Sequence, residues 1–338
     1  MTSKEIIKRV IKYDGPPRIG FDFIAPYPKD IRWILSGEFK SRYDSWLEWG
    51  EYADVKALVP GFEGQVCMDC FGNVYGRLNE KTKGECLRGA LQDDISKAEE
   101  YELPAIDMKR TMALKDVIAG ASDKYILGAS PISVFSTFRD LRRMDNALTD
   151  IVLEPEHTRL LLDKLLALML KVVDIDRELG FDGLIIYDDW GMQNTTFISP
   201  NAFRTFFKPM YRAVADRLHE YGMSLFLHSC GNTKALITDF IEAGVDVLQF
   251  DQPELHGSVE LAAKYGGRVA FYSPVDIQKV MATGDREYIE KTALDMVMAF
   301  RQFGGGLIAM DYPNWQDINV ELEWAKWARD IFVANAAL

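Results

Sequence analysis

The chain has 338 residues, of which 48% are apolar and 12% aromatic, so it is long enough to bury a large core. A formal net charge of -12, with no Lys- or Arg-rich block, argues against a surface that binds nucleic acid or anionic lipid. No window approaches about 18 uninterrupted apolar residues, and the charged first segment is unlike a signal peptide. We therefore expect a cytoplasmic protein, folded as one domain over residues 1–338, that binds neither nucleic acid nor membrane.

Short apolar or β-branched runs that end in polar residues alternate with helical patterns along the chain. Two weaker strand candidates come first, at residues 18–24 and 54–59. A stretch that alternates around a Gly-Asn pair follows at 64–78 and predicts an inserted β-hairpin. Six stronger strand candidates span 124–130, 182–188, 223–230, 245–251, 269–275 and 306–311. Amphipathic helices are predicted between them, for example at 155–179, 200–221 and 285–303.

Eight strands separated by helices long enough for parallel crossovers predict an α/β fold. We expect a single (β/α)8 TIM-type barrel with an N-terminal extension and a β-hairpin insertion. The alternative is an open, doubly wound sheet. The barrel is favoured because no GxGxxG motif follows an early strand, and the glycine run 304–306 precedes a strand instead of opening a helix.

The carboxyl ends of barrel strands build the active site, and two metal-binding residue types stand at one of these ends. His228 and Cys230 are two residues apart on a strand, so their side chains point to the same face and form half of a Zn²⁺ site. A third ligand must come from another strand. Asp311 is the candidate, with Glu154 and Asp251 as alternatives. The competing interpretation is a hydrogen-bonded core histidine beside a small buried thiol.

Two adjacent acids, Asp188 and Asp189, end the strand candidate at 182–188. Alternation lets only one of them face the barrel mouth, where it would act as a general acid or base, bind a polar substrate group, or orient His228. The competing interpretation is a helix N-cap beside a solvated neighbour. The residues predicted to bind substrate at this mouth are Tyr187, Trp190, Gln193 and Gln252.

Three further cysteines, Cys67, Cys70 and Cys86, include a CxxC pair. This pair has no matching CxxC or HxxxH motif, and its segment reads as a hairpin instead of a helix N-terminus. We interpret all three residues as structural thiols.

The segments IIYDDWGMQ, FISPNAFRTFFKPMY and LFLHSCGNTKALITDFIEAGVDVLQFDQP resemble the uroporphyrinogen decarboxylase superfamily, specifically its corrinoid-dependent methyltransferase branch. The resemblance is strong from about Tyr125 onward, and DCFGNVYGRL also resembles a segment of this group. It implies a (β/α)8 barrel that binds zinc through an H-x-C pair, matched by His228 and Cys230, and a later cysteine. GGGLIAMDYPNW lacks that cysteine, and Asp311 is the nearest residue to its place.

The resemblance implies a zinc-dependent methyltransferase that moves a methyl group between a small methylated substrate and the cobalt of a corrinoid. An O-methyl aromatic ether is the favoured substrate. The corrinoid is expected on a separate corrinoid-binding protein, because the chain has no D-x-H-x-x-G motif, and a homodimer is compatible with this scheme. One alternative is a porphyrinogen decarboxylase, although the N-terminal segment PPRIGFDFIAPYP offers one arginine, Arg18, where that enzyme has R-Q-A-G-R. The other alternative is a non-catalytic corrinoid-binding module.

Overall fold

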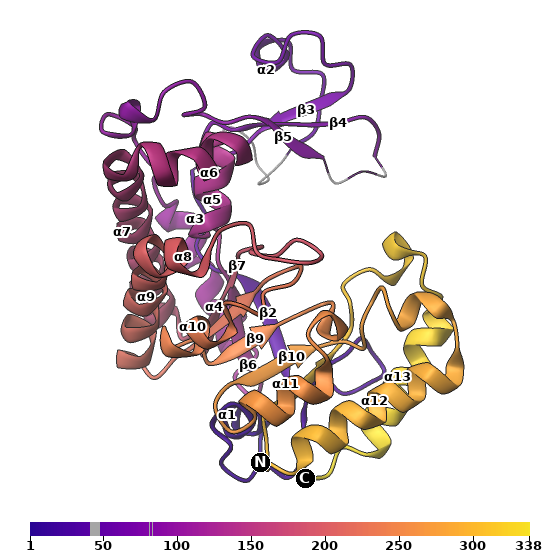
Figure 1. Ribbon diagram of the computed structural model, residues 1–338. Helices are drawn as coiled ribbons and strands as arrows, with labels where there is room; N and C mark the ends of the chain where they lie inside the picture. Colours follow the sequence, from indigo (N-terminus) through magenta and orange to yellow (C-terminus); the bar gives the residue numbers. More distant parts are fainter. Residues whose placement is uncertain (41–47, 81, 83) are drawn as a thin grey trace.

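The computed structural model describes residues 1–40, 48–80, 82 and 84–338. Its eight parallel strands form one sheet in the order β1-β11-β10-β9-β8-β7-β6-β2, curled into a nearly closed barrel with helices on the outside (Figure 1). The predicted (β/α)8 barrel is confirmed, and the doubly wound alternative is wrong. The strands of this sheet are β1 (Gly20–Asp22), β2 (Ile31–Leu35), β6 (Tyr125–Ala129), β7 (Gly183–Tyr187), β8 (Ser224–His228), β9 (Val247–Gln249), β10 (Ala270–Ser273) and β11 (Leu307–Met310).

Helices cover the outside of the barrel after each strand from β6 onward. The predicted helix at 155–179 is confirmed as α7 (Pro155–Leu179), and the one at 200–221 is divided into α8 and α9 near Phe207. The other crossover helices are α5 (Phe135–Arg142), α6 (Met144–Leu153), α8 (Pro200–Phe206), α9 (Lys208–Glu220), α10 (Ile237–Glu242), α11 (Ser258–Tyr265), α12 (Arg286–Arg301) and α13 (Leu322–Ala334). Short 3-10 turns lie at Ile95–Ala98, Pro253–Leu255, Met281–Thr283 and Trp315–Ile318.

An insertion between β2 and β6 extends from the top of the barrel in Figure 1. Its antiparallel sheet contains the predicted hairpin, β3 (Gln65–Met68) and β4 (Val74–Arg77), and a further strand, β5 (Glu85–Arg88). The helices α3 (Met108–Met112) and α4 (Leu114–Ala119) lead back to β6.

The strand predicted at 54–59 is wrong, because this stretch begins in helix α2 (Ala53–Lys56). Its buried residue Val55 packs with Val66 and Val74 of the insertion, so the apolar character of the stretch serves a small separate core. The second barrel strand is instead β2, where the exposed residue Arg32 interrupts the apolar run.

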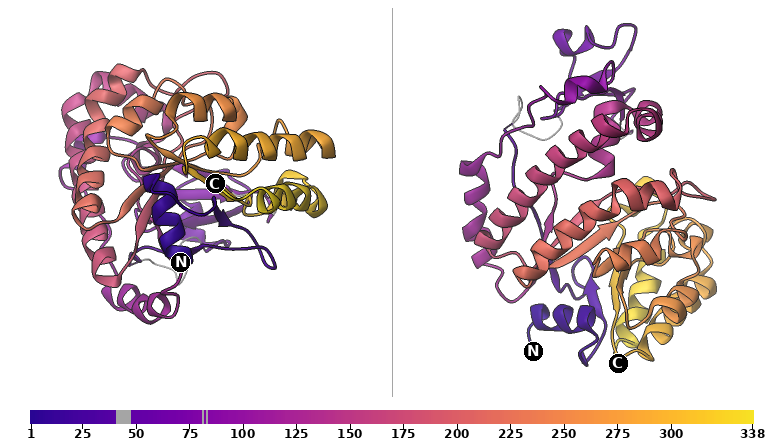
Figure 2. Two further views of the ribbon diagram at one scale, coloured as in Figure 1. Left: turned by 90° about the horizontal axis from the view of Figure 1, so that it is seen from below. Right: turned by 60° about the vertical axis from the view of Figure 1, so that its left-hand side comes forward.

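Helix α1 (Ser3–Lys12) closes the barrel at the amino ends of the strands. A capping box between Thr2 and Glu5 begins the helix, and Lys4 and Lys8 each contact Asp182, just before β7, at 2.9 Å. The apolar face of α1 packs against the residues that fill the barrel interior. Both chain termini lie at this end of the barrel (Figure 2).

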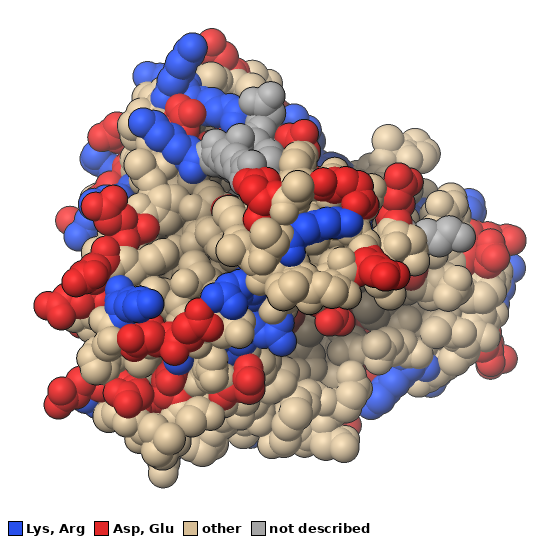
Figure 3. Space-filling model, turned by 90° about the horizontal axis from the view of Figure 1, so that it is seen from above, with Lys and Arg blue, Asp and Glu red and all other residues tan. Residues whose placement is uncertain are grey.

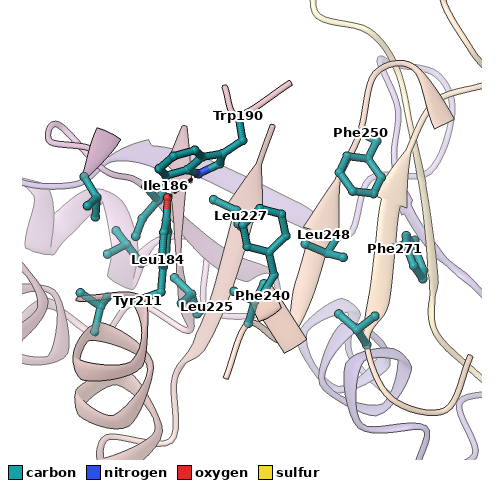
Figure 4. Close-up of a cluster of buried hydrophobic side chains, with 14 of the residues drawn as sticks. Leu184, Ile186, Trp190, Tyr211, Leu225, Leu227, Phe240, Leu248, Phe250 and Phe271 are labelled. Carbon is teal, nitrogen blue, oxygen red and sulfur yellow. Dashed lines mark hydrogen bonds between the residues drawn. The ribbon is translucent and has the colours of Figure 1, made fainter. Parts of the chain in front are cut away.

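The larger core lies between the outer face of the sheet and the helices. Leu225 and Leu227 of β8 point outward into it, toward Phe240 of α10 and Tyr211 of α9 (Figure 4). Phe226, between the two leucines, points into the barrel interior. In each barrel strand, the same alternation determines which side chains face the barrel interior and which face the helices.

The barrel has a seam between its first two strands, since no ladder joins β1 to β2 in the described part of the chain. Asp22 bridges this seam from the inside. Its Oδ2 accepts hydrogen bonds from Trp33 Nε1, at 2.6 Å, and from the hydroxyl of Tyr272, and its Oδ1 lies 3.1 Å from Lys29 Nζ. These side chains supplement the backbone hydrogen bonds that join β1 to the segment just before β2, such as the one from Asp30 N to the carbonyl of Phe21 at 2.7 Å.

Within the described ranges, no helix combines the length and apolarity needed to cross a lipid bilayer.

Replacing Ile7 with alanine should weaken the closure of the barrel by α1. Ile7 is fully buried, so Ile7→Ala should lower the free energy of unfolding by about 2 to 5 kcal/mol, measured by urea denaturation. The exposed Lys12 on the same helix provides the control, and Lys12→Ala should change stability by about 0.5 kcal/mol or less. Equal effects of the two variants would show that α1 does not support the barrel.

Candidate active site and metal centre

Each barrel strand presents every second side chain to the interior, and these side chains form a layer at the carboxyl end. Tyr187 pairs in register with His228, His228 with Gln249, and Gln249 with Tyr272. Met310 of β11 pairs in register with Asp22 of β1, and both side chains also belong to this layer. One step further along the same phase, Asp189, Cys230 and Asp251 follow on from β7, β8 and β9.

Three potential metal ligands converge at this mouth. His228 Nε2 lies 3.4 Å from Asp189 Oδ1 and 3.4 Å from Cys230 Sγ, and one ligand atom from each residue lies within 4.8 Å of the others. A nitrogen, a sulfur and an oxygen ligand at this spacing fit a tetrahedral zinc site with a fourth position left for substrate or water. The sequence predicted His228 and Cys230 as ligands and Asp189 as a catalytic acid, and the structure brings all three together.

Backbone contacts between the loops after β7 and β8 fix this spacing. Cys230 N donates to Asp189 Oδ1 at 2.8 Å, and Gly191 N donates to the carbonyl of Cys230 at 3.1 Å. Gly191 and Gly231 pack so closely that a Cβ on Gly231 would lie 2.1 Å from the carbonyl oxygen of Gly191. Gly231 also has a φ of +75°, which favours glycine. The two loops can approach this closely only because both positions lack a side chain.

Gln249 orients the histidine of the cluster. The side-chain oxygen of Gln249 contacts Nδ1 of His228, and its amide nitrogen donates to Asp251 Oδ1 at 2.8 Å. With the proton on Nδ1, the lone pair of Nε2 points toward Asp189 and Cys230, as metal binding requires. Sequence analysis missed Gln249, although its place two residues before Asp251, inside an apolar run, was a usable signal.

Charges within the cluster favour binding of a proton or a metal ion. Burial disfavours the imidazolium, but Asp189 and Cys230 outweigh it and raise the pKa of His228 well above its ordinary value. Burial also acts against the Asp189 carboxylate, yet the hydrogen bond and charge of His228 lower the pKa of Asp189 to about 2. Burial raises the pKa of the Cys230 thiol, with His228 acting in the opposite direction. A metal ion would displace the protons from His228 and Cys230.

Asp311 lies outside this cluster. Strand β11 directs Ile308 and Met310 inward, so the neighbouring Asp311 is directed toward helix α13. Its Oδ1 accepts from Arg329 Nε at 2.7 Å, in a pair whose side chains are 6% and 7% exposed, and its Oδ2 accepts from Ile24 N at 2.8 Å. Both oxygens are engaged, so the geometry favours Asp189 as the third ligand.

The two alternative third ligands also lie outside the cluster. Glu154 lies between α6 and α7 and contacts His157 Nδ1 at 3.0 Å. Asp251 faces the mouth, but it is not in the group of residues whose ligand atoms lie within 4.8 Å of one another.

The two adjacent acids have different environments. Asp188 is fully buried and accepts hydrogen bonds from Val134 N at 3.1 Å, Ser136 N at 2.7 Å and the Tyr211 hydroxyl at 2.5 Å. It therefore anchors the loop after β6 to β7 and α9. Asp189 faces the mouth, so the predicted division between the two acids agrees with the geometry.

Two cavities meet at Tyr187 and His228. The first cavity, of about 490 Å³, extends toward the insertion and is also lined by Asp189, Tyr75 and Arg139. The second cavity, of about 460 Å³, lies over the seam between β1 and β2. Tyr187 thus lies where sequence analysis predicted a substrate-binding residue.

The other predicted substrate-binding residues line neither cavity. Trp190 is fully buried and stacks on Phe135, with ring centroids 4.2 Å apart. Its Nε1 donates to the Tyr211 hydroxyl at 2.9 Å, and both residues are labelled in Figure 4. Gln193 is exposed on the loop after β7, and Gln252 is buried before the turn at Pro253–Leu255.

The insertion cysteines remain free thiols. Burial raises the pKa of Cys67 and of Cys86 to about 12 and also raises that of Cys70, so all three are protonated at neutral pH. These properties support the interpretation of structural thiols.

The face seen from above carries both signs of charge. Figure 3 shows acidic and basic side chains interspersed there, with uncharged surface between them. A partner that approaches this face would meet a surface that carries both positive and negative charge.

A (β/α)8 barrel with a candidate metal centre at the carboxyl ends of its strands is the class of protein that these features define. The chain belongs to the family described as Uroporphyrinogen decarboxylase (URO-D), whose sequence profile matches residues 97–310. The family resemblance predicted from the sequence is thereby confirmed. Strands β1 and β2, helix α1 and the antiparallel sheet of the insertion precede the matched region, so part of the barrel lies outside it.

Two known proteins illustrate the similarity. The chain is 27% identical over 172 residues to a uroporphyrinogen decarboxylase of Magnetococcus marinus, a match that covers 49% of this chain and 45% of that protein. It thus spans less than half the length of that relative. The solved structure of a methyltransferase from Methanosarcina mazei superposes with a TM-score of 0.67 at 15% identity, covering 98% of this chain and 99% of that one. This second likeness shows a shared fold.

Alanine variants of Asp189 and Asp311 should separate the two candidates for the third zinc ligand. Asp189→Ala should weaken zinc binding by about 10 to 100-fold or more, measured by competition with a chromophoric chelator. Asp311→Ala should keep its zinc but lose about 3 to 5 kcal/mol of stability, because it leaves the buried Arg329 unpaired. The matched pair Asp189→Asn and Asp311→Asn repeats the comparison with a milder change. Loss of zinc from the Asp311 variants alone would assign the ligand to Asp311.

Zinc affinity should rise with pH, because the raised pKa values of His228 and Cys230 leave both ligands protonated in the metal-free protein. Between about pH 6 and 8, the apparent affinity should increase by up to about tenfold per pH unit for each proton displaced. Calorimetry in two buffers of different ionisation enthalpy measures the released protons directly. A pH-independent affinity without proton release would exclude these two ligands.

Proposed function

We propose that this chain is a zinc-dependent methyltransferase that moves a methyl group between a small methylated substrate and the cobalt of a corrinoid carried by a partner protein. The observation that carries the proposal is the convergence of Asp189, His228 and Cys230 at the barrel mouth, with Gln249 orienting the histidine. Family membership and the shared fold with a methyltransferase support it.

The ligand set fits zinc in chemistry and charge. His228 supplies a neutral nitrogen, and Asp189 and Cys230 supply two negative charges that balance those of Zn²⁺. When bound, zinc would supply Lewis acidity that polarises an ether or hydroxyl oxygen, or lowers the pKa of a thiol. The Gln249 and Asp251 side chains hold the imidazole in the required orientation.

The first cavity is the proposed site of the methyl donor, because Asp189 and His228 both line it. Phe71, Tyr75 and Tyr187 offer aromatic surface to a methoxylated ring, the favoured donor class. The methyl group would leave the donor oxygen for a reduced cobalt atom, and the oxygen would take up a proton. The partner would approach from the open face at the carboxyl ends of the strands.

Electrostatics favour this function over decarboxylation of a porphyrinogen, a substrate with many carboxylates. The cationic residue that lines the first cavity, Arg139, already pairs with Asp140 at 3.1 Å, and Lys29 in the second cavity pairs with Asp22. Neither cavity therefore offers an uncompensated positive charge from the described residues. A polyanionic substrate would be poorly stabilised there.

Turnover should require a reduced corrinoid, and the two adjacent acids should affect it differently. With zinc-loaded protein, cob(I)alamin and a panel of methyl donors, methylcobalamin should appear in the absorption spectrum. Asp189→Asn should reduce the rate by about 100-fold or more, because it alters a proposed ligand. Asp188→Asn should lower stability by roughly 1 to 3 kcal/mol while its folded fraction stays active, because it disturbs a buried hydrogen-bonded anchor.

The double variant Cys67→Ser with Cys70→Ser is the control and should keep its zinc and its turnover. Binding of cobalamin without consumption of any donor would favour the non-catalytic module. Release of CO₂ from a porphyrinogen without corrinoid would establish the decarboxylase and overturn the proposal.

A further inference from the structure

The second cavity shares Tyr187 and His228 with the first, and Gln249 and Asp251 support the metal centre, but the rest of its lining has no part in the proposed methyl transfer. Five aromatic side chains contribute to its wall, and they come from the loop after β1, from β2, β7 and β10, and from the segment after β11. These residues are Phe23, Trp33, Tyr187, Tyr272 and Tyr312. Trp33 and Tyr272 are stacked, with ring centroids 6.1 Å apart. Tyr187, Trp33 and Tyr312 are at least partly exposed and offer aromatic surface to a small ligand, whereas Phe23 and Tyr272 are buried.

Three carboxylates also line this cavity, and one of them has no cationic partner. Asp22 lies 3.1 Å from Lys29 Nζ, and Asp311 lies 2.7 Å from Arg329 Nε. Asp251 accepts a hydrogen bond from the neutral amide of Gln249, and in the described part of the chain no Lys, Arg or His nitrogen lies within 4.0 Å of its carboxylate. Asp251 therefore forms no direct ion pair, although its charge acts on His228 at longer range.

The arrangement is unsuited to a bare metal ion. Ligation by several carboxylates requires their oxygens to converge, and in the described residues the convergent group is Asp189, His228 and Cys230, not these three acids. An organic cation has its charge spread over a larger surface, and aromatic faces stabilise it without direct ligation. A carboxylate with aromatic neighbours is the usual composition of such a site.

We propose that the second cavity binds a small organic cation of the methylated ammonium class, with Asp251 as its counter-ion and the aromatic wall around its methyl groups. This proposal goes beyond the proposed methyl transfer, because it requires neither zinc nor a corrinoid. A ligand in this cavity would lie on the other side of Tyr187 and His228 from the first cavity.

The metal centre is compatible with this neighbour. His228 directs Nε2 toward Asp189 and Cys230, and its Nδ1 side is occupied by Gln249. The two anionic ligands would cancel the charge of a zinc ion, so a cation in the second cavity would experience little repulsion from it.

The test compares choline with its neutral isostere 3,3-dimethylbutan-1-ol by isothermal titration calorimetry. Choline should bind about tenfold more tightly or better, because both ligands have the same shape and only one carries charge. Asp251→Asn should remove most of this preference while leaving the weak binding of the alcohol unchanged. The variant retains an oxygen for the hydrogen bond from Gln249, so the fold should be preserved.

A second variant and a charge control complete the experiment. Tyr312→Leu removes one aromatic side chain from the wall and should weaken choline binding several-fold. Asp317→Asn removes an exposed acid outside the cavity and should have no effect, which controls for the loss of net charge. Equal affinity for the two ligands, or full choline binding by Asp251→Asn, would overturn the proposal.

Repeating the titration after chelation of metal separates this proposal from the proposed function. Choline binding should persist in the metal-stripped protein, because the proposed contacts are Asp251 and the aromatic side chains, and His228 is the one zinc ligand in the described lining of the cavity. Its loss on chelation would assign the binding to the metal centre and overturn the proposal. Absence of methyl transfer to cobalamin would reject the proposed function and leave the binding result unaffected.

Discussion

A parallel strand in a barrel can direct only every second side chain to the interior, and the chemistry of this protein depends on that constraint. It places His228 and Cys230 on one side of the β8 strand end and brings Asp189 beside them from β7. The same constraint directs Asp188 and Asp311 outward, where each binds partners that hold the surrounding helices and loops. Aspartates in this barrel therefore have different roles according to whether their side chains face the barrel mouth or the surrounding helices and loops.

Much of the fold could be predicted because buried parallel strands are continuous apolar runs. The six later strands were recognisable for this reason, and helix α7 was recognisable by its amphipathic pattern. Strand β2 was not, because Arg32 interrupts it, and the apolar residues at 54–59 belong to a separate small core. Strand β5 was also missed, because it lies outside the alternating stretch that predicted the hairpin.

In the candidate site, features set by spacing along the chain could be predicted, whereas features set by contacts between distant segments could not. The spacing of His228 and Cys230 is a local pattern, so the sequence was sufficient to pair them. The position of Asp311 depends on the phase of β11 and on Arg329, which comes from a helix that follows it. The role of Gln249 depends on its register with His228. The sequence of one strand does not determine its register with a neighbouring strand about 20 residues away.

The two cavities differ in how their charges are arranged around the shared histidine. In the first, the positive charge of Arg139 is matched by Asp140, and Asp189 and His228 of the candidate metal centre line the cavity. In the second, two acids are matched by cations and Asp251 is not. One side chain, His228, thus touches two environments of different electrostatic character.

The contact between Gly191 and Gly231 sets the separation of two loops without involving any ligand side chain. Backbone contacts, together with the hydrogen bond from Cys230 N to Asp189 Oδ1, therefore define the distance between the positions that follow β7 and β8. Side chains at those positions could be exchanged among oxygen, nitrogen and sulfur ligands while that distance stayed the same. In this barrel, the types of the candidate ligands and the spacing of the loops that carry them are therefore determined largely by different atoms.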